Sequence, residues 1–270
     1  MSFPRGSLLL LLPLAVACGD KDGGTDETAD AATDSDSATD SAADDTGGED
    51  TDDATPAGEV SFQTVDGVDL VADWYPASSP ARPAVLLLHM VPPNWDRSSW
   101  PAAFISGLQD QDWAVLVVDR RGAGDSGGTA RDAYEGAGGR HDVDACVDFL
   151  GGEGAGGLAI IGASNGTTSM VDFIVGTGDG GALVPSALGF MTGGSYTENQ
   201  SAMEDVAAVG VPAMFTYSTA ERGWSVDQMA LDPGGWAFNE YENGDHGTEM
   251  FSAAPAVSAD LVDFLGGHLD

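Results

Sequence analysis

The stretch Leu158-Ala159-Ile160-Ile161-Gly162-Ala163-Ser164-Asn165-Gly166 leads an apolar run into the pattern Gly-x-Ser-x-Gly. A helical repeat of apolar residues begins directly behind it. In a nucleophile elbow, strand and helix approach so closely around a strained serine that the residues two before and two after it must be small. Gly162 and Gly166 meet that requirement. The stretch therefore predicts a strand, a sharp turn and a helix, with Ser164 as the candidate nucleophile.

A second match to Gly-x-Ser-x-Gly lies at Gly124-Asp125-Ser126-Gly127-Gly128, which is also the sequence around the serine of trypsin-like proteases. Those proteases need a histidine and an aspartate well upstream and an all-β double barrel. Ser126 instead follows a buried strand and leads into a glycine-rich loop rather than a helix. We predict that Ser126 is a structural turn residue.

Apolar strands and amphipathic helices alternate on both sides of the elbow. Strands are expected at 60–65, 68–75, 84–89, 113–119, 158–163, 187–192, 211–218 and 236–241. The first two flank Asp66-Gly67, which predicts a tight β-hairpin. Helices are expected at 98–111, around 143–150, behind the elbow, at 198–209 and at 248–265. The alternation predicts an α/β domain over 60–270, with a mainly parallel, eight-stranded sheet covered by helices on both faces and an N-terminal β-hairpin.

Composition and charge limit the kinds of partner that the protein is expected to bind. The 270 residues, of which 42% are hydrophobic, suffice for one large domain with its own core. Of the 44 acidic residues, 15 lie between Gly19 and Glu59, which leaves 29 from Val60 onward, where seven arginines and no lysine oppose them. The predicted domain therefore has a formal charge of −22. Such a surface repels nucleic acid and anionic lipid headgroups, and it favours a salt-rich or extracellular setting.

The N-terminal segment resembles an export signal. It has a basic start at Arg5, an apolar core and small residues before Cys18. Its end, Leu14-Ala15-Val16-Ala17-Cys18, resembles the lipobox of bacterial lipoproteins, whose cysteine is lipidated. This implies a lipoprotein signal peptide at 1–18, with Cys18 as the lipidation site, and an exported protein anchored by lipid on the periplasmic or surface face of the outer membrane. An ordinary signal peptide cleaved at a nearby Ala-x-Ala-like site is the alternative. Residues 19–59 offer almost nothing to bury and are expected to form a disordered acidic linker.

Two further motifs accompany the elbow. Asp119-Arg120-Arg121-Gly122-Ala123-Gly124-Asp125-Ser126 resembles the Asp-x-Arg-Gly-x-Gly-x-Ser turn after the fourth strand of many α/β hydrolases. Leu86-Leu87-Leu88-His89 and the proline-containing loop behind it resemble the end of their third strand. The chain is thus similar to the α/β-hydrolase superfamily, in particular to small serine esterases without a lid and to dienelactone-hydrolase-like members, although Ser164 stands where true dienelactone hydrolases have cysteine. The resemblance implies the α/β-hydrolase fold and a triad in the chain order serine, acid, histidine.

Only two of the four histidines follow Ser164 in the chain. His246 stands in Gly244-Asp245-His246-Gly247, before the closing helix, and resembles the family's histidine loop. His268 lies two residues from the C-terminus and is expected to be solvated. Capping or core hydrogen bonds explain His89 at a strand end and His141 at a helix start. His246 is therefore the predicted general base.

A histidine base needs an acid that holds its tautomer. The resemblance points to the end of strand 211–218, where Glu221 stands in place of the family's usual aspartate. Pairing of Glu221 with the adjacent Arg222 is the structural alternative, and Asp227 and Glu198 are the alternative acids. We predict Glu221 as the third member of the triad.

The oxyanion of an acyl-transfer intermediate needs preorganised N–H donors. One is expected from the backbone of Asn165, directly after the nucleophile, and the other from the loop after the third strand. That loop begins His89-Met90, where the family usually has His-Gly. By position the second donor is Val91, with Met90 as the second choice.

The sequence thus predicts a serine hydrolase that cleaves small or short-chain carboxylic esters through an acyl-enzyme. Only 57 residues separate Ser164 from Glu221, which leaves no room for a large lid domain. Thioesterase or peptidase activity with the same triad remains an alternative, as does a non-catalytic, surface-tethered binding protein on a hydrolase scaffold. No metal or cofactor is expected, because the histidines are isolated and no Gly-x-Gly-x-x-Gly follows a strand. The oligomeric state stays open.

Overall fold

A computed structural model of the chain describes residues 55–176 and 183–269. The predicted signal peptide with Cys18, and positions 19–54 of the predicted linker, lie outside the described residues. The strands are β1 (Gly58–Gln63), β2 (Asp69–Tyr75), β3 (Pro83–Leu88), β4 (Ala114–Val118), β5 (Gly157–Ala163), β6 (Ala187–Met191), β7 (Ala213–Ser218) and β8 (Trp236–Tyr241). The helices are α1 (Ala102–Gln109), α2 (Gly138–Gly152), α3 (Gly166–Gly176), α4 (Met203–Val209), α5 (Arg222–Asp227), α6 (Met250–Ala253) and α7 (Ala256–Leu269).

β1 and β2 form the predicted N-terminal hairpin, paired antiparallel. Its turn is wider than the two-residue turn expected from Asp66-Gly67. It begins at Thr64, whose carbonyl accepts the Gly67 N–H at 2.9 Å, and Gly67 has a φ of 82°. Val65 therefore lies in the turn and is 84% exposed instead of ending a strand. Within the turn only Gly67 has a positive φ, as in three-residue hairpin loops that combine a type I turn with a left-handed glycine, whereas the two-residue type I′ turn would need positive φ at Asp66 as well.

The eight strands form one sheet in the order β1-β2-β4-β3-β5-β6-β7-β8. β2 runs antiparallel to both of its neighbours, and the pairings from β4 to β8 are parallel. The predicted mainly parallel, eight-stranded sheet is confirmed. Because β3, β5, β6, β7 and β8 run in the same direction, their carboxyl ends lie along one edge, where ligand sites of open α/β sheets are found.

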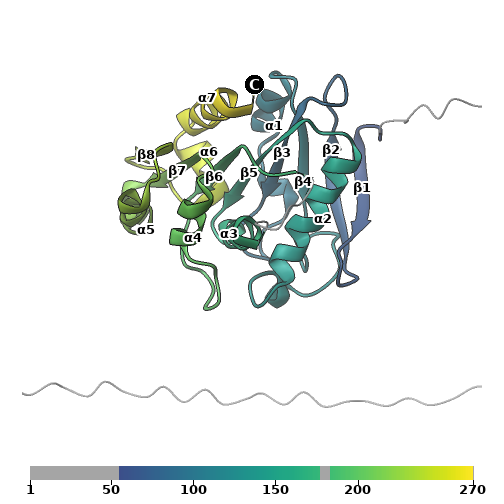
Figure 1. The fold of residues 1–270 in the computed structure, drawn as a ribbon, viewed down its shortest axis with the longest axis horizontal. Helices are drawn as coiled ribbons and strands as arrows, with labels where there is room; N and C mark the ends of the chain where they lie inside the picture. Colours follow the sequence, from purple (N-terminus) through teal and green to yellow (C-terminus); the bar gives the residue numbers. More distant parts are fainter. Residues whose placement is uncertain (1–54, 177–182, 270) are drawn as a thin grey trace, which may run out of the picture. The chain divides into compact units, whose positions relative to one another are not determined.

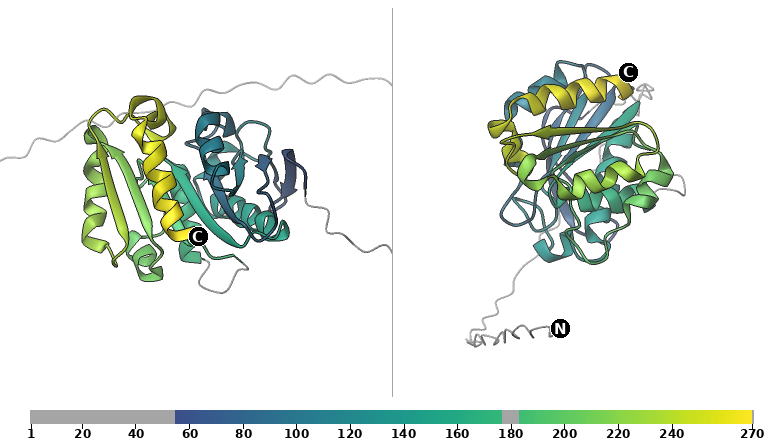
Figure 2. Two further views of the ribbon diagram at one scale, coloured as in Figure 1. Left: turned by 90° about the horizontal axis from the view of Figure 1, so that it is seen from above. Right: turned by 90° about the vertical axis from the view of Figure 1, so that its left-hand side faces the viewer.

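Helices cover both faces of the sheet (Figures 1 and 2). α2, α3 and α4 pack on one face, together with Leu86 and Ile160. α1 and α7 pack on the other face, together with Leu87 and Ile161. Successive strand residues point to opposite faces, so a strand buried on both sides must be apolar throughout. The doubly covered architecture is therefore confirmed.

The helix predicted at 98–111 begins only at Ala102, which follows a short 3-10 turn. Trp100 precedes Pro101 and has φ −85° and ψ 122°, an extended conformation. A proline ring disfavours the helical region for the residue before it, so the helix cannot include Trp100. The apolar stripe was predicted correctly, but the helix start was wrong.

The closing helix predicted at 248–265 is divided into α6 and α7. The break falls at Ala254, which precedes Pro255 and has φ −134° and ψ 75°. The same steric restriction before proline ends α6, and α7 begins directly after Pro255. The prediction of one continuous helix was therefore wrong, although α7 extends further toward the C-terminus than expected.

The helix predicted at 198–209 begins at Met203. Upstream of it, the Ser201 N–H donates to Asp172 Oδ1 on α3 at 2.7 Å. Residues 192–202 form a loop after β6, and no domain is inserted between β6 and α4. The site carries no large lid in the described part of the chain.

Cys146 lies on α2 and is fully buried, as its apolar stripe predicts. Burial raises the pKa of its thiol well above the ordinary value, as expected for a core cysteine. None of the helices in the described part of the chain is both long and apolar enough to cross a bilayer.

Candidate active site

The turn between β5 and α3 holds Ser164 at a φ of 48°, in the left-handed region that non-glycine residues rarely adopt. A Cβ on Gly162 would lie 2.8 Å from the backbone nitrogen of Thr167. A Cβ on Gly166 would lie 2.4 Å from the carbonyl oxygen of Leu88, at the end of β3. Strand, turn and helix therefore approach closely enough to exclude any larger residue at the two glycines.

His246 lies between Ser164 and Glu221. Its Nε2 is 2.6 Å from Ser164 Oγ, and its Nδ1 is 2.8 Å from Glu221 Oε2. A carboxylate accepts hydrogen bonds, so Nδ1 carries the proton in this contact and Nε2 is left to accept from the serine hydroxyl. The side chains that follow β5, β7 and β8 thus form the hydrogen-bonded chain that serine activation requires.

The backbone around His246 fixes where its ring stands. Asp245 and Gly247 both have positive φ values, 55° and 54°. The Gly247 N–H donates to Thr192 Oγ1 at 2.6 Å, which joins the histidine loop to the end of β6. A Cβ on Gly247 would lie 2.2 Å from Met90 Sδ, so the loop also packs on the segment after β3. The histidine loop is therefore held between two other segments of the site.

The hydrogen-bonded chain is partly open to solvent. Ser164 is 5% exposed, whereas the side chains of His246 and Glu221 are 34% and 42% exposed. A hollow of about 520 Å³ lies beside this pair; its lining residues are Ser218, Ala220, Glu221, Glu242, Asn243, Gly244, Asp245, His246 and Ala253. The hollow thus adjoins His246 and Glu221, whereas Ser164 is not among its lining residues.

The two alternative acids lie elsewhere. Asp227 ends α5 and Glu198 stands in the loop after β6, and both line a different hollow. Neither makes a hydrogen bond to His246, whose Nδ1 contacts Glu221. Arg222, the other partner considered for Glu221, pairs instead with Glu240 at 3.4 Å.

The three histidines outside the predicted triad have other contacts. His268 packs against Phe264, with ring centroids 4.7 Å apart. His141, near the start of α2, has its Nδ1 3.4 Å from Asp66 Oδ1. His89 is fully buried at the end of β3, where it makes core hydrogen bonds to Met90 O and the Arg120 N–H.

Ser126 makes structural hydrogen bonds. Its Oγ donates to the carbonyl of Asp119 at 2.6 Å and accepts the N–H of Val71 at 2.8 Å. These contacts tie the turn after β4 to β2. Among residues 55–176 and 183–269, no histidine forms a hydrogen bond with Ser126.

The candidate oxyanion donors come from two loops. Asn165 directly follows Ser164, and Met90 and Val91 follow β3. In the part of the chain that the structure describes, the backbone N–H groups of these three residues donate to no protein acceptor. They thus remain the candidate oxyanion donors.

Tyr196 was not predicted as part of the site. Its hydroxyl donates to the carbonyl of Thr192 at 2.6 Å, and its ring stands edge-on to His246 with centroids 6.4 Å apart. Burial raises the pKa of the Tyr196 hydroxyl. Its place in a glycine-rich loop directly after a strand was the one sequence signal that could have identified it.

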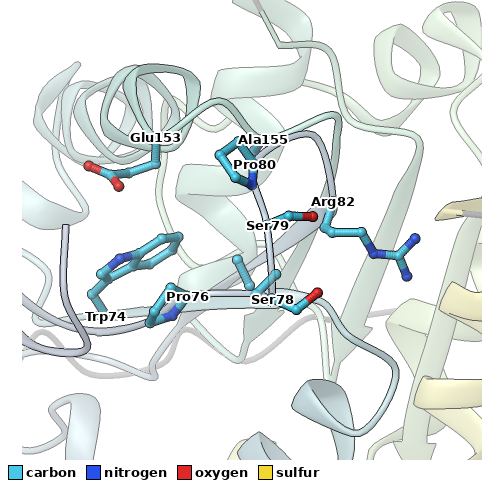
Figure 3. A pocket seen from close by; sticks show the side chains of 10 residues that line it. Trp74, Pro76, Ser78, Ser79, Pro80, Arg82, Glu153 and Ala155 are labelled. Atoms are coloured by element: carbon cyan, nitrogen blue, oxygen red, sulfur yellow. The ribbon is translucent and has the colours of Figure 1, made fainter. Parts of the chain in front are cut away.

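A third and smaller hollow, of about 100 Å³, lies beside Trp74, at the end of β2 and the start of β3 (Figure 3). Its charged side chains are already engaged. Glu153 accepts the backbone N–H of Thr55 at 3.0 Å, and Arg82 pairs with Asp112 at 3.0 Å. Within 55–176 and 183–269, no group of three or more metal-binding side chains occurs.

No protein-family model matches the chain, and no curated protein sequence matches it. Solved structures do resemble it. The esterase Pf2001 of Pyrococcus furiosus aligns with a TM-score of 0.63 at 15% identity, over 80% of this chain and 92% of that chain. The esterase RhEst1 of Rhodococcus sp. ECU1013 aligns with a TM-score of 0.59 at 16% identity, over 79% of this chain and all of that chain. Together with the strand order, this likeness shows that the chain has the α/β-hydrolase fold.

Proposed function

We propose that this protein is a serine hydrolase that cleaves small or short-chain carboxylic esters through an acyl-enzyme. The observation that carries the proposal is the pair of hydrogen bonds that link Ser164, His246 and Glu221, at 2.6 and 2.8 Å. Their position at the carboxyl edge of the sheet, next to unengaged backbone N–H groups, supports the same chemistry. The esterases among the structural neighbours are consistent with it.

In the proposed reaction, Ser164 Oγ attacks the ester carbonyl while His246 Nε2 takes the hydroxyl proton. The oxyanion that forms accepts hydrogen bonds from the N–H of Asn165 and from Val91, or from Met90 as second choice. His246 then gives its proton to the departing alcohol, which leaves the acyl group on Ser164. Water, deprotonated by His246, attacks the acyl-enzyme, and the carboxylic acid is released with the serine restored.

The preference for small esters rests on the openness of the site. His246 and Glu221 are partly exposed, and among the described residues a loop instead of an inserted domain follows β6, so no inserted domain covers a long acyl chain there. Enzymes for long-chain lipids need an apolar cover for the acyl chain. Series of p-nitrophenyl esters from acetate to palmitate therefore test the preference, with kcat/KM expected to fall as the acyl chain lengthens.

Hydrolysis of p-nitrophenyl acetate tests the activity itself. Ser164→Ala should reduce kcat by about 10³-fold or more, because a triad without its nucleophile loses nearly all of its rate enhancement. Ser126→Ala is the matched control, since Ser126 lies in the other Gly-x-Ser-x-Gly match and should leave the rate unchanged. Equal hydrolysis by wild type and Ser164→Ala contradicts the proposal.

We further propose that the protein is exported and anchored to a membrane through a lipid on Cys18, with 19–59 as the linker to the hydrolase domain. This rests on the sequence pattern before Cys18. The expected result in a bacterial host is that the wild type partitions into detergent, and that Cys18→Ser partitions into the aqueous phase. Identical partitioning would favour an ordinary signal peptide.

A further inference from the structure

Arg120 is fully buried behind the loop that follows β3. Among residues 55–176 and 183–269, no carboxylate forms an ion pair with its guanidinium, whereas the adjacent Arg121 pairs with Asp66 and Asp142. Burial lowers the pKa of Arg120 to about 10, so the side chain remains charged at neutral pH. Burial of a charge without a paired carboxylate lowers the stability of the fold. Such an arginine therefore points to a role beyond packing.

One guanidinium nitrogen of Arg120 contacts both loops that supply the candidate oxyanion donors. Its Nη1 donates to Asn165 Oδ1 at 2.9 Å. The same nitrogen lies 3.3 Å from the carbonyl oxygens of His89 and Met90. A single side chain from the end of β4 thus bridges the nucleophile turn and the loop after β3.

The other guanidinium nitrogen anchors Arg120 to the opposite side. Its Nη2 donates to the carbonyl of Ala133 at 2.9 Å and to Ser169 Oγ on α3 at 2.8 Å. The planar guanidinium cannot rotate without breaking these bonds, because its donors have a fixed geometry. The positions of the groups bound to Nη1 are therefore fixed relative to α3.

His89 completes this arrangement. Its Nε2 accepts the backbone N–H of Arg120 at 2.9 Å, so Nδ1 carries the proton and donates to Met90 O at 2.8 Å. The carbonyl of Met90 is thus held by two donors, His89 and Arg120. Burial, followed by the charge of Arg120, lowers the pKa of His89 to about 3, which keeps this donor pattern constant at neutral pH.

The direction of a carbonyl fixes the direction of the next N–H. In a trans peptide the two point to opposite sides of the chain. Arg120 draws the carbonyls of His89 and Met90 toward itself, so the N–H groups of Met90 and Val91 point away from Arg120. These are the loop donors of the proposed reaction, and they stay unengaged in the described part of the chain.

We propose that Arg120 is a positioning residue that orients the oxyanion donors of the loop after β3 and the turn at Asn165. The proposal rests on the proposed esterase function. A substitution of Arg120 should therefore weaken binding of the transition state more than binding of the substrate. The reason is that the N–H groups bind the negative charge that forms only in the transition state.

Arg120→Lys tests the proposal while it keeps the charge. An ammonium is a compact donor that cannot hold both loops and both anchors at once. The expected result is a fall in kcat of about tenfold or more with KM changed by less than about twofold, since loss of an entire oxyanion donor costs about 10²- to 10³-fold. The matched control is Arg121→Lys, whose partners Asp66 and Asp142 lie outside the site; it should lower stability but leave kcat unchanged.

A ³¹P NMR spectrum of the adduct between a fluorophosphonate and Ser164 supplies a second readout. Its phosphonyl oxygen occupies the position of the oxyanion, so the chemical shift responds to the donors there. We expect the shift to change in Arg120→Lys and to stay at the wild-type value in Arg121→Lys. A general loss of packing would not separate the two variants in this way.

If Arg120→Lys does not fold, Ser169→Ala takes its place, because it removes one anchor of the guanidinium and leaves both loops intact. It should lower kcat at unchanged KM and move the ³¹P shift. Wild-type kcat and ³¹P shift in the folded variants would overturn the role of Arg120. Failure of the wild type itself to hydrolyse esters or to label at Ser164 would instead overturn the proposed function.

Discussion

Glu221 determines which nitrogen of His246 carries a proton. It reaches Nδ1 from a 3-10 turn directly after β7, and the contact leaves Nε2 facing Ser164. Both members of the pair are more than one third exposed, so the hydrogen-bond geometry has to orient the ring without help from a closed apolar pocket. Loss of the carboxylate should therefore mainly lower kcat.

Glu221→Gln is expected to lower kcat by about 10²- to 10⁴-fold, because an amide can donate to Nδ1 and stabilise the wrong tautomer. Initial rates on p-nitrophenyl acetate measure the effect. Asp227→Asn and Glu198→Gln serve as controls, since neither carboxylate contacts His246, and both should retain the wild-type rate. A comparable loss in either control would identify a different acid.

His89 gives the fold a specific pH dependence. Its folded-state pKa is about 3 and its ordinary value is 6.5, so only the unfolded chain takes up the proton between these limits. The contribution of His89 to the free energy of unfolding is therefore complete above about pH 6.5. It decreases by about 1.4 kcal/mol for each pH unit below that value. Urea unfolding at pH 7, 6, 5 and 4 should show a steeper loss for the wild type than for His89→Gln. Parallel curves would contradict this assignment.

At the scale of elements, close packing around the elbow depends on glycine. A Cβ on Gly166 would meet the carbonyls of Leu88 and His89 at 2.4 and 2.6 Å, and backbone atoms cannot yield as a flexible side chain can. Gly166→Ala should therefore lower the free energy of unfolding by about 1–3 kcal/mol or more, as overpacking does, and should also reduce kcat. Thermal and urea unfolding measure the first effect.

Gly107→Ala is the control for that experiment. Gly107 lies inside α1, and a Cβ there would meet no atom within 4 Å. Alanine should stabilise this helix by up to about 1 kcal/mol, because glycine is the poorer helix former. If both substitutions have the same effect on stability, close approach at the elbow is not what requires Gly166.

Hydrophobic periodicity was sufficient to predict the elements that build the sheet. The eight strands differ from their predicted ranges by few residues. β3 to β7 are short apolar runs buried by their neighbours, whereas the edge strands β1 and β8 are largely exposed or half-buried. Helix ends were less predictable. The start of α1 after Pro101 and the break before Pro255 follow from a local steric rule that the apolar stripe does not contain. The apolar pattern also placed the start of α4 too early, since the helix begins only at Met203.

Long-range contacts also explain which site residues the sequence missed. Arg120 contacts Asn165, 45 positions away, and Tyr196 stands edge-on to His246 from the loop after β6. Each occupies a segment with its own local role, the turn after β4 and a glycine-rich loop. Their contribution becomes visible only when the strand order brings the carboxyl ends of β3, β4, β5 and β6 together.

At the scale of the whole molecule, the excess of acidic residues sets a negative potential around the site. From Val60 onward the formal charge is −22, and Arg97, Arg121 and Arg131 are already paired with carboxylates. This potential repels an anionic substrate before any contact. Salt reduces the range of the repulsion from about 10 Å at 0.1 M to about 3 Å at 1 M.

We therefore expect a cationic ester to have a higher kcat/KM than an anionic ester of the same size at low salt. Rates on such a matched pair at 0.05 and 1 M NaCl measure the effect, and the difference should shrink at high salt. A preference that does not depend on salt would indicate specific contacts instead of the overall charge.

Labelling with a fluorophosphonate, followed by peptide mass spectrometry, tests the central claim most directly, because the reagent reacts with serines that a general base activates. We predict one adduct, on Ser164, which is retained in Ser126→Ala and abolished in Ser164→Ala and, by loss of the base, strongly slowed in His246→Ala. Absence of labelling in the wild type, or an adduct on Ser126, would contradict the account.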